Sequence, residues 1–228
     1  MFTNKLSNTL MIAFLSLTFL IITAKAQNEG QSLAEKYAAQ ATERMKSELN
    51  LTASQVPKVH QANLTAARSV ADWVKKYLGD PSANKKEMVT SALSVSKQYE
   101  SQLQGILGPS QWSTYLKKKA ERNAKMLTQM MTMRYDLTEE QASEVEKINL
   151  DAALKIQNAM NQSQDSKNPV QKAVNPIQKM WRDKTFKPIL EEREQALQKV
   201  LTADQWKSHE QYKMEMREIL SKMMQERT

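Results

Sequence analysis

The sequence predicts an all-α protein built from antiparallel helical hairpins. Residues that favour helices, such as Ala, Leu, Gln, Glu, Lys and Met, are abundant, and the alternating β-branched runs typical of strands are rare. Only four glycines occur and none follows Gly108, so the second half of the chain has no glycine to interrupt a helix. The third observation is a five-residue helix-start motif that occurs four times.

This motif has the form Leu-Thr-x-x-Gln. It occurs at 51–55, 137–141 and 201–205, and a variant at 107–111 has Gly108 and Pro109 as N-cap and first helical residue. The Thr hydroxyl accepts a hydrogen bond from the amide three residues on, and the Gln side chain reaches back to the Thr amide. The residues expected to act as structural caps are Leu51, Thr52, Gln55, Leu107, Gln111, Leu137, Thr138, Gln141, Leu201, Thr202 and Gln205.

The four motifs belong to an internal duplication. A shift of 86 positions, from Leu51 to Leu137, superposes many identical residues, and a shift of 94 positions, from Leu107 to Leu201, does the same. The identical pairs include Met45 with Met131, Asn63 with Asn149, and Glu100 with Glu194. One motif alone is a common helix start, but this longer self-similarity indicates repeated supersecondary units. The unequal shifts imply an insertion in the second copy, which we place at the polar run 161–169.

Residues 1–26 are typical of a secretory signal peptide. Lys5 lies in a short polar start, an apolar run follows from Leu10, and Ala24-Lys25-Ala26 fits the cleavage site. The apolar run is shorter than the ~20 residues that span a bilayer, so we expect cleavage after Ala26, with an uncleaved anchor as the alternative. The chain has no Cys, so it cannot be a lipoprotein that is anchored through a Cys. An exported protein without disulfides is most at home in a bacterial periplasm.

Two helical repeats are expected after the signal peptide, at 27–118 and 119–228. The first contains helices at about 32–49, 52–78 and 81–104, with one backbone bond lost at Pro57 and a stop at Gly79-Asp80-Pro81. One continuous helix, at about 109–133, joins the repeats. The second repeat continues with a helix from Thr138 to the polar run, a segment broken near 184–188, and a helix from Thr202 to about 225.

The sequence contains no pattern typical of catalysis or of metal binding. His60 and His209 lack the spacing of zinc ligands, and we expect both to be half-exposed. The adjacent acidic pairs at 139–140 and 191–192 point to different sides of a helix and form no carboxylate dyad. We therefore expect no enzyme activity, no cofactor and no metal site.

Methionine is in excess, with 14 residues, and the chain carries a formal net charge of +8. Methionines on the helix at about 109–133 follow a basic run. These methionines have three interpretations, as core residues, as an adaptable apolar surface for varied partners, or as Cu(I) ligands, and the core interpretation is favoured. The candidate client-binding residues on this helix are Lys117, Lys118, Lys119, Arg122, Lys125, Met126, Met130 and Met133. A basic exported chain is expected to meet acidic proteins or anionic lipids and no nucleic acid.

The segment Met-Lys-Ser-Glu-Leu-Asn-Leu-Thr-Ala-Ser-Gln at 45–55, followed by the second motif at 107–111, resembles the Spy/CpxP family of periplasmic proteins, also called the LTXXQ-motif family. The resemblance covers both repeats. It implies an all-α fold, an antiparallel dimer shaped like a curved cradle, and a role as an ATP-independent chaperone or an envelope-stress regulator. Family members usually have one pair of motifs per chain, whereas this chain has two. Zinc-responsive relatives have His-rich or Cys-containing ends, which this chain lacks.

The features together predict an ATP-independent periplasmic chaperone, a holdase, that binds unfolded or partly folded proteins through a basic helical surface bearing Met and aromatic side chains. The alternative is a regulatory accessory protein of an envelope-stress or metal-stress system, bound to a membrane sensor kinase. A helical envelope protein with neither role is a third interpretation. The duplication predicts an elongated, cradle-like pseudo-dimer within one chain, a monomer, with a homodimer of such chains as the alternative.

Overall fold

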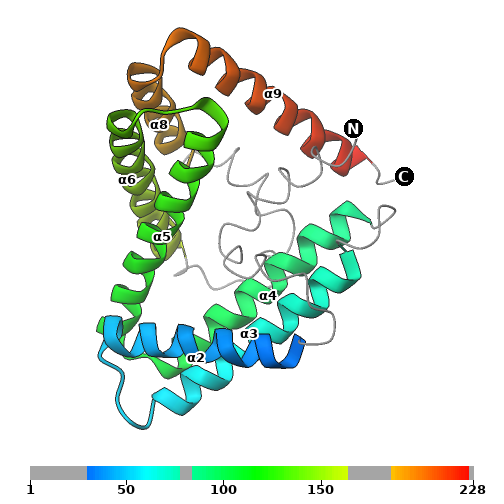
Figure 1. Ribbon diagram of the computed structural model, residues 1–228, viewed down its shortest axis with the longest axis vertical. Helices are drawn as coiled ribbons and strands as arrows, with labels where there is room; N and C mark the ends of the chain where they lie inside the picture. Colours follow the sequence, from blue (N-terminus) through cyan, green and yellow to red (C-terminus); the bar gives the residue numbers. More distant parts are fainter. Residues whose placement is uncertain (1–29, 78–83, 164–185, 226–228) are drawn as a thin grey trace. The chain divides into compact units, whose positions relative to one another are not determined.

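The structure, a computed structural model, describes residues 30–77, 84–163 and 186–225, and these residues form helices and short links with no strand (Figure 1). The predicted all-α class is therefore confirmed for the described chain. The expected signal peptide, the turn at Gly79-Asp80-Pro81, most of the polar run 161–169 and Pro176 lie outside the described residues.

The described residues contain seven helices. They are α2 (Gly30–Leu49), α3 (Val56–Tyr77), α4 (Lys85–Ile106), α5 (Pro109–Tyr135), α6 (Glu139–Ser163), α8 (Phe186–Val200) and α9 (Ala203–Gln225). Each of the four motifs lies at the start of one of them, namely α3, α5, α6 or α9. The stretch 109–133 lies within α5, which at 27 residues is the longest described helix.

The helix α3 begins later than its motif would suggest. The helices α5, α6 and α9 start at the residue after the N-cap, whereas α3 starts at Val56, four residues after Thr52. Pro57 has no amide hydrogen, so the carbonyl of Ala53 has no partner one turn on. Residues 53–55 instead form a turn, in which the amides of Gln55 and Val56 donate to the Thr52 carbonyl at 3.0 and 3.1 Å.

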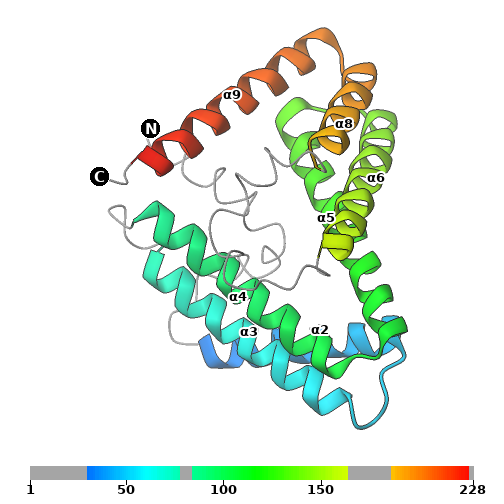
Figure 2. The ribbon, with the colours of Figure 1, turned by 180° about the vertical axis from the view of Figure 1, so that it is seen from behind.

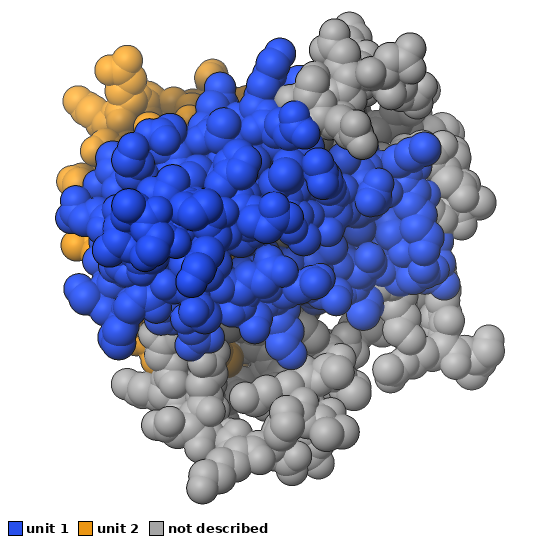
Figure 3. Space-filling view, turned by 90° about the horizontal axis from the view of Figure 1, so that it is seen from below, with its two compact units in different colours: residues 1–115, 216–228 blue, residues 116–215 orange. Residues whose placement is uncertain are grey.

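The chain divides into two compact units within α5. The first unit contains residues 1–115 and 216–228, and the second contains residues 116–215 (Figure 3). In the first unit α2 packs along α3, and α3 packs along α4. In the second unit α6 packs along α8, as Figures 1 and 2 show from opposite sides.

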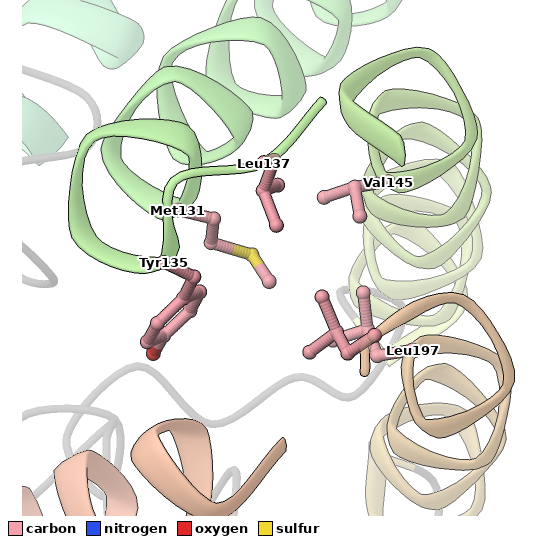
Figure 4. Close-up of a cluster of buried hydrophobic side chains, with 6 residues drawn as sticks. Met131, Tyr135, Leu137, Val145 and Leu197 are labelled. Carbon is pink, nitrogen blue, oxygen red and sulfur yellow. The ribbon is translucent and has the colours of Figure 1, made fainter. Parts of the chain in front are cut away.

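Each unit has its own apolar core. In the first unit one cluster joins α3 and α4 and includes Trp73 and Met88, and another joins α2 and α3 and includes Ala38 and Leu64. In the second unit the labelled side chains of Figure 4 point toward one another from α5, α6, α8 and the link between α5 and α6. They are Met131, Tyr135, Leu137, Val145 and Leu197, and Leu201 completes the cluster. The Leu of every motif is buried, so each motif also anchors its helix start in a core.

Candidate functional site

The Gln of each motif has two structural roles in the second unit. As predicted, Gln141 Oε1 accepts a hydrogen bond from the Thr138 amide at 3.1 Å. The same side chain also donates through Nε2 to Gln205 Oε1 at 2.8 Å and to the Val200 carbonyl at the end of α8 at 3.0 Å. Gln205 returns the contact, donating to Gln141 Oε1 at 3.2 Å and to the Tyr135 carbonyl at the end of α5 at 3.1 Å. The two helix starts are thus joined by a reciprocal amide pair.

The first unit contains the same reciprocal amide pair. Gln55 Nε2 donates to Gln111 Oε1 at 2.8 Å, and Gln111 Nε2 donates to Gln55 Oε1 at 3.0 Å. The two amides also bond to the carbonyls of Ile106 and Leu49, at 3.0 and 3.2 Å. The capping pattern predicted the helix caps but not the amide pair. The available signal was that all four copies have Gln, since Glu serves a capping box equally well but has no N–H to donate.

A buried asparagine in each unit ties the first helix of that unit to the second. Asn63 Nδ2 donates to Thr42 Oγ1 at 2.9 Å, and Asn149 Nδ2 donates to Thr128 Oγ1 at the same distance. Both asparagines are almost fully buried, at 1% and 3% exposure. A buried amide without partners would be costly, so these contacts fix how the helices pack.

The residue that donates to the side-chain oxygen of this asparagine differs between the units. In the first, the Tyr99 hydroxyl donates to Asn63 Oδ1 at 2.6 Å. In the second, Arg193, which occupies the equivalent position in the repeat, donates from Nε to Asn149 Oδ1 at 2.9 Å. The Arg193 side chain is 14% exposed, so the change brings a positive charge into the protein. Burial lowers the pKa of Arg193, and the charge of Glu194 opposes that effect.

This charge is part of an ionic cluster made of Arg193, Glu194, His209 and Lys213. The Glu194 carboxylate contacts Arg193 at 2.9 Å, His209 Nε2 at 3.0 Å and Lys213 at 2.6 Å. The other ring nitrogen of His209 lies 3.2 Å from the Tyr135 hydroxyl. Lys213 also contacts the Glu210 carboxylate at 2.7 Å, so the cations Arg193 and Lys213 face two carboxylates, and the geometry of the ionic cluster is that of a packing element.

The expectation of a half-exposed histidine holds for His60 and is wrong for His209, which is 5% exposed. The rings of Tyr135 and Trp206 lie beside its imidazole, with centroids at 5.7 and 5.3 Å, and Glu194 supplies the polar partner that makes burial tolerable. When the two repeats are aligned, His209 corresponds to Tyr115 of the first unit. An aromatic residue at the equivalent position was the sequence signal that could have indicated the burial of His209.

The candidate client-binding residues lie on α5, and most of them share its solvent face. The buried side of this part of α5 contains Ala120, Ala124 and Thr128. Counted from Ala124 at about 100° per residue, the band between about 100° and about 200° carries what we call the outer strip, namely Lys118, Arg122, Lys125, Met126, Gln129 and Met133. Gln129 was not among the predicted residues. Lys119 and Met130 adjoin the outer strip beyond Met126, at about 220° and about 240°, whereas Lys117 lies at about 20°, on the side of Ala124.

The outer strip is basic at one end and apolar at the other. The helix α5 has six Lys or Arg residues and a single acidic residue, Glu121, which pairs with Lys118 at 2.9 Å. Met133 is 78% exposed, which makes it the more exposed of the two large hydrophobic side chains that stand out from the described surface. Lys125 is exposed as well. An apolar side chain so fully in solvent contributes nothing to the core and is available for contact with another molecule.

A shallow groove of about 580 Å³ lies between α5 and α6 beside the outer strip. It is lined by Lys125, Thr128, Gln129 and Thr132 of α5 and by Glu139, Ala142, Ser143, Glu146, Lys147 and Leu150 of α6. Lys125 and Gln129 belong to both the outer strip and the groove. In the first unit the seam between α2 and α3 is packed by Ala34, Ala38, Leu64 and Ala67, with Tyr37 against them.

The described ranges contain neither a candidate metal centre nor a candidate membrane span. No three His, Cys, Asp or Glu side chains gather there in the way that metal ligands would. None of the described helices combines the length and the apolar character needed to cross a membrane.

Comparison with known families gives two consecutive matches. Residues 23–115 and 116–226 each match the family described as Domain of unknown function (DUF4890). The double match agrees with a repeated helical domain. Comparisons with curated proteins and with solved structures gave no match.

We predict that Gln141→Glu lowers the free energy of unfolding by ~1–3 kcal/mol, the cost of leaving buried or half-buried polar groups without a partner. The variant keeps the acceptor that caps Thr138 but loses both donated bonds, and it places a carboxylate against Gln205 Oε1. Denaturant titration provides the measurement. Gln195→Glu, an exposed position on α8, is the control with the same change of charge, and equal costs for both variants would contradict the role of the amide pair.

The ionic cluster gives the second unit a dependence on acid. Burial raises the pKa of Glu194, but hydrogen bonds from His209 and Lys213 and the charges of His209 and Arg193 outweigh it and lower the pKa to about 2, from an ordinary value of 4.5. The carboxylate therefore stabilises the folded state fully above pH 4.5, and this stabilisation is lost as the pH falls from 4.5 to about 2. We predict that the difference in unfolding free energy between the wild type and Glu194→Gln shrinks over that range. A difference that stays constant from pH 7 to pH 2 would contradict it.

Proposed function

The chain belongs to the DUF4890 family, which it matches twice, and we propose that this tandem of helical repeats is an ATP-independent chaperone that holds unfolded or partly folded proteins. The observation that carries the proposal is the outer strip of α5, where cations and an exposed methionine share one helix face. The resemblance of the repeated motifs to the Spy/CpxP family supports the same class of function.

The outer strip combines two forces that suit the capture of unfolded chains. Lys118, Arg122 and Lys125 attract acidic segments over a distance and speed the first encounter. Met126 and Met133 then offer flexible, polarizable side chains that adapt to varied apolar groups. The apolar contact area is small, so a bound client keeps the freedom to fold and leave without energy from ATP.

We also propose that the protein is exported to the periplasm. Residues 1–26 have the pattern of a signal peptide, and the chain has no Cys. Stability without disulfides is supported by the contacts within each unit, above all the reciprocal amide pairs and the buried asparagines. These contacts need no oxidising partner to form.

We predict that the protein suppresses aggregation of an acidic, chemically unfolded client without nucleotide, at near-stoichiometric amounts, when light scattering is followed on dilution. The triple variant Lys118→Gln, Arg122→Gln and Lys125→Gln should need roughly tenfold more protein for the same effect, because the three charges together contribute on the order of 1.4 kcal/mol to binding. High salt should weaken the wild type in the same direction.

The matched control for this variant is Lys58→Gln, Lys75→Gln and Lys199→Gln, which removes the same charge from exposed positions on α3 and α8. Equal losses for both triples would show that net charge alone acts, and that the outer strip is not the site. A wild type that suppresses no aggregation but retains one tight partner in a pull-down would instead favour a regulatory protein bound to a sensor.

The two repeats also predict the oligomeric state. If relatives with one pair of motifs pair as two chains, a covalent link through α5 makes the same pairing intramolecular, at a high effective concentration. We therefore predict a monomer at micromolar concentration, measured by light scattering in solution. A mass twice that of the chain would reject the pseudo-dimer and indicate a homodimer.

A further inference from the structure

Two methionine sulfurs are deeply buried and serve as hydrogen-bond acceptors. Met131, 5% exposed, accepts from Asn149 Nδ2 at 3.8 Å and from Arg193 Nη2 at 3.7 Å. Met45, its equivalent in the first unit, is 2% exposed and has the same kind of partners, with Asn63 at 3.9 Å. An oxidant reaches these sulfurs only if the core opens, so the fold protects them.

Two other methionines have the opposite environment. Met133 on α5 is 78% exposed and Met214 on α9 is 62% exposed. Their thioethers lie in solvent, where small oxidants have direct access. The two differ in location, because Met133 ends the outer strip of α5 whereas Met214 lies on another helix. The chain therefore contains an exposed methionine within the candidate binding surface and a second one outside it.

We propose that Met133 is an oxidation site through which hydrogen peroxide, or another small oxidant that transfers oxygen, weakens client binding. The inference rests on the proposed chaperone function and adds its regulation. It assigns the effect to the side chain that is both most accessible and placed in the outer strip. Met214 is oxidised with comparable ease but without effect on binding.

The chemistry balances with the peroxide as the only co-reactant. A lone pair of the Met133 sulfur attacks one peroxide oxygen, an S–O bond forms, and the O–O bond breaks. The sulfur is oxidised by two electrons to the sulfoxide, and the departing oxygen, which takes both peroxide hydrogens, leaves as water. The sulfoxide is polar and accepts hydrogen bonds, so an apolar contact of the outer strip is replaced by a hydrated group.

The first test maps the order of oxidation in the purified protein under limiting hydrogen peroxide. Peptide mass spectrometry should find one added oxygen on Met133 and Met214 well before Met45 and Met131. Oxidation of Met131 at the same rate as Met133 would overturn the inference, because exposure would then not select the site.

The second test measures how oxidation changes the suppression of client aggregation. After limiting oxidation, the wild type should need roughly threefold more protein to suppress client aggregation, the loss expected for one small apolar contact. Met133→Leu keeps an apolar side chain without sulfur and should retain its activity after peroxide, whereas Met214→Leu, the matched control, should lose as much as the wild type. An equal loss in Met133→Leu would overturn the role of Met133. An untreated wild type that suppresses no aggregation would reject the proposed function and the effect on binding together, while the mapped order of oxidation would still be decided on its own.

Discussion

The reciprocal amide pair between two motif glutamines is the contact on which each unit depends. Within a unit, two helix ends and two helix starts meet at one place. The last carbonyls and the first amides of these helices have no partner within their own helix, so they need hydrogen bonds from side chains. A Gln side chain has a donor and an acceptor on the same planar group, so one pair of glutamines serves both sets. The motif Leu adjoins this contact and is buried beside it, which links the polar junction to the apolar core.

The elements that could be predicted from the sequence were those that local chemistry decides. The caps located the starts of α5, α6 and α9, and Pro57 accounts for the delayed start of α3. Contacts between distant residues were not predictable in this way, since the capping pattern gives no sign that Gln55 meets Gln111. His209 was misjudged for the same reason, because its burial depends on the rings of Tyr135 and Trp206, which only the folded chain brings beside it. For the candidate site, the basic and Met-rich helix could be predicted from the sequence, whereas the exposure of Met133 is known only from the folded chain.

The duplication allowed two related units to use different chemistry around the same asparagine. The first unit completes the contact with a neutral hydroxyl, from Tyr99, and the second completes it with the charge of Arg193. A charge in that place requires Glu194, and Glu194 in turn is surrounded by His209 and Lys213. Glu194 and Lys213 have identical counterparts in the first repeat, Glu100 and Lys119, so within the ionic cluster the repeats differ only where Arg193 stands for Tyr99 and His209 for Tyr115.

The helix α5 belongs to both repeats, because the boundary between the two units lies within it. Because the last helix of one repeat continues as the first helix of the next, the two repeats share one unbroken helix and have no separate linker between them. In the repeat, α9 corresponds to the first part of α5, yet Met214 and Glu218 stand where α5 has Ala120 and Ala124. Ala120 and Ala124 are buried whereas Met214 and Glu218 are exposed, so this face of α9 has lost the small side chains that α5 buries at the same positions of the repeat.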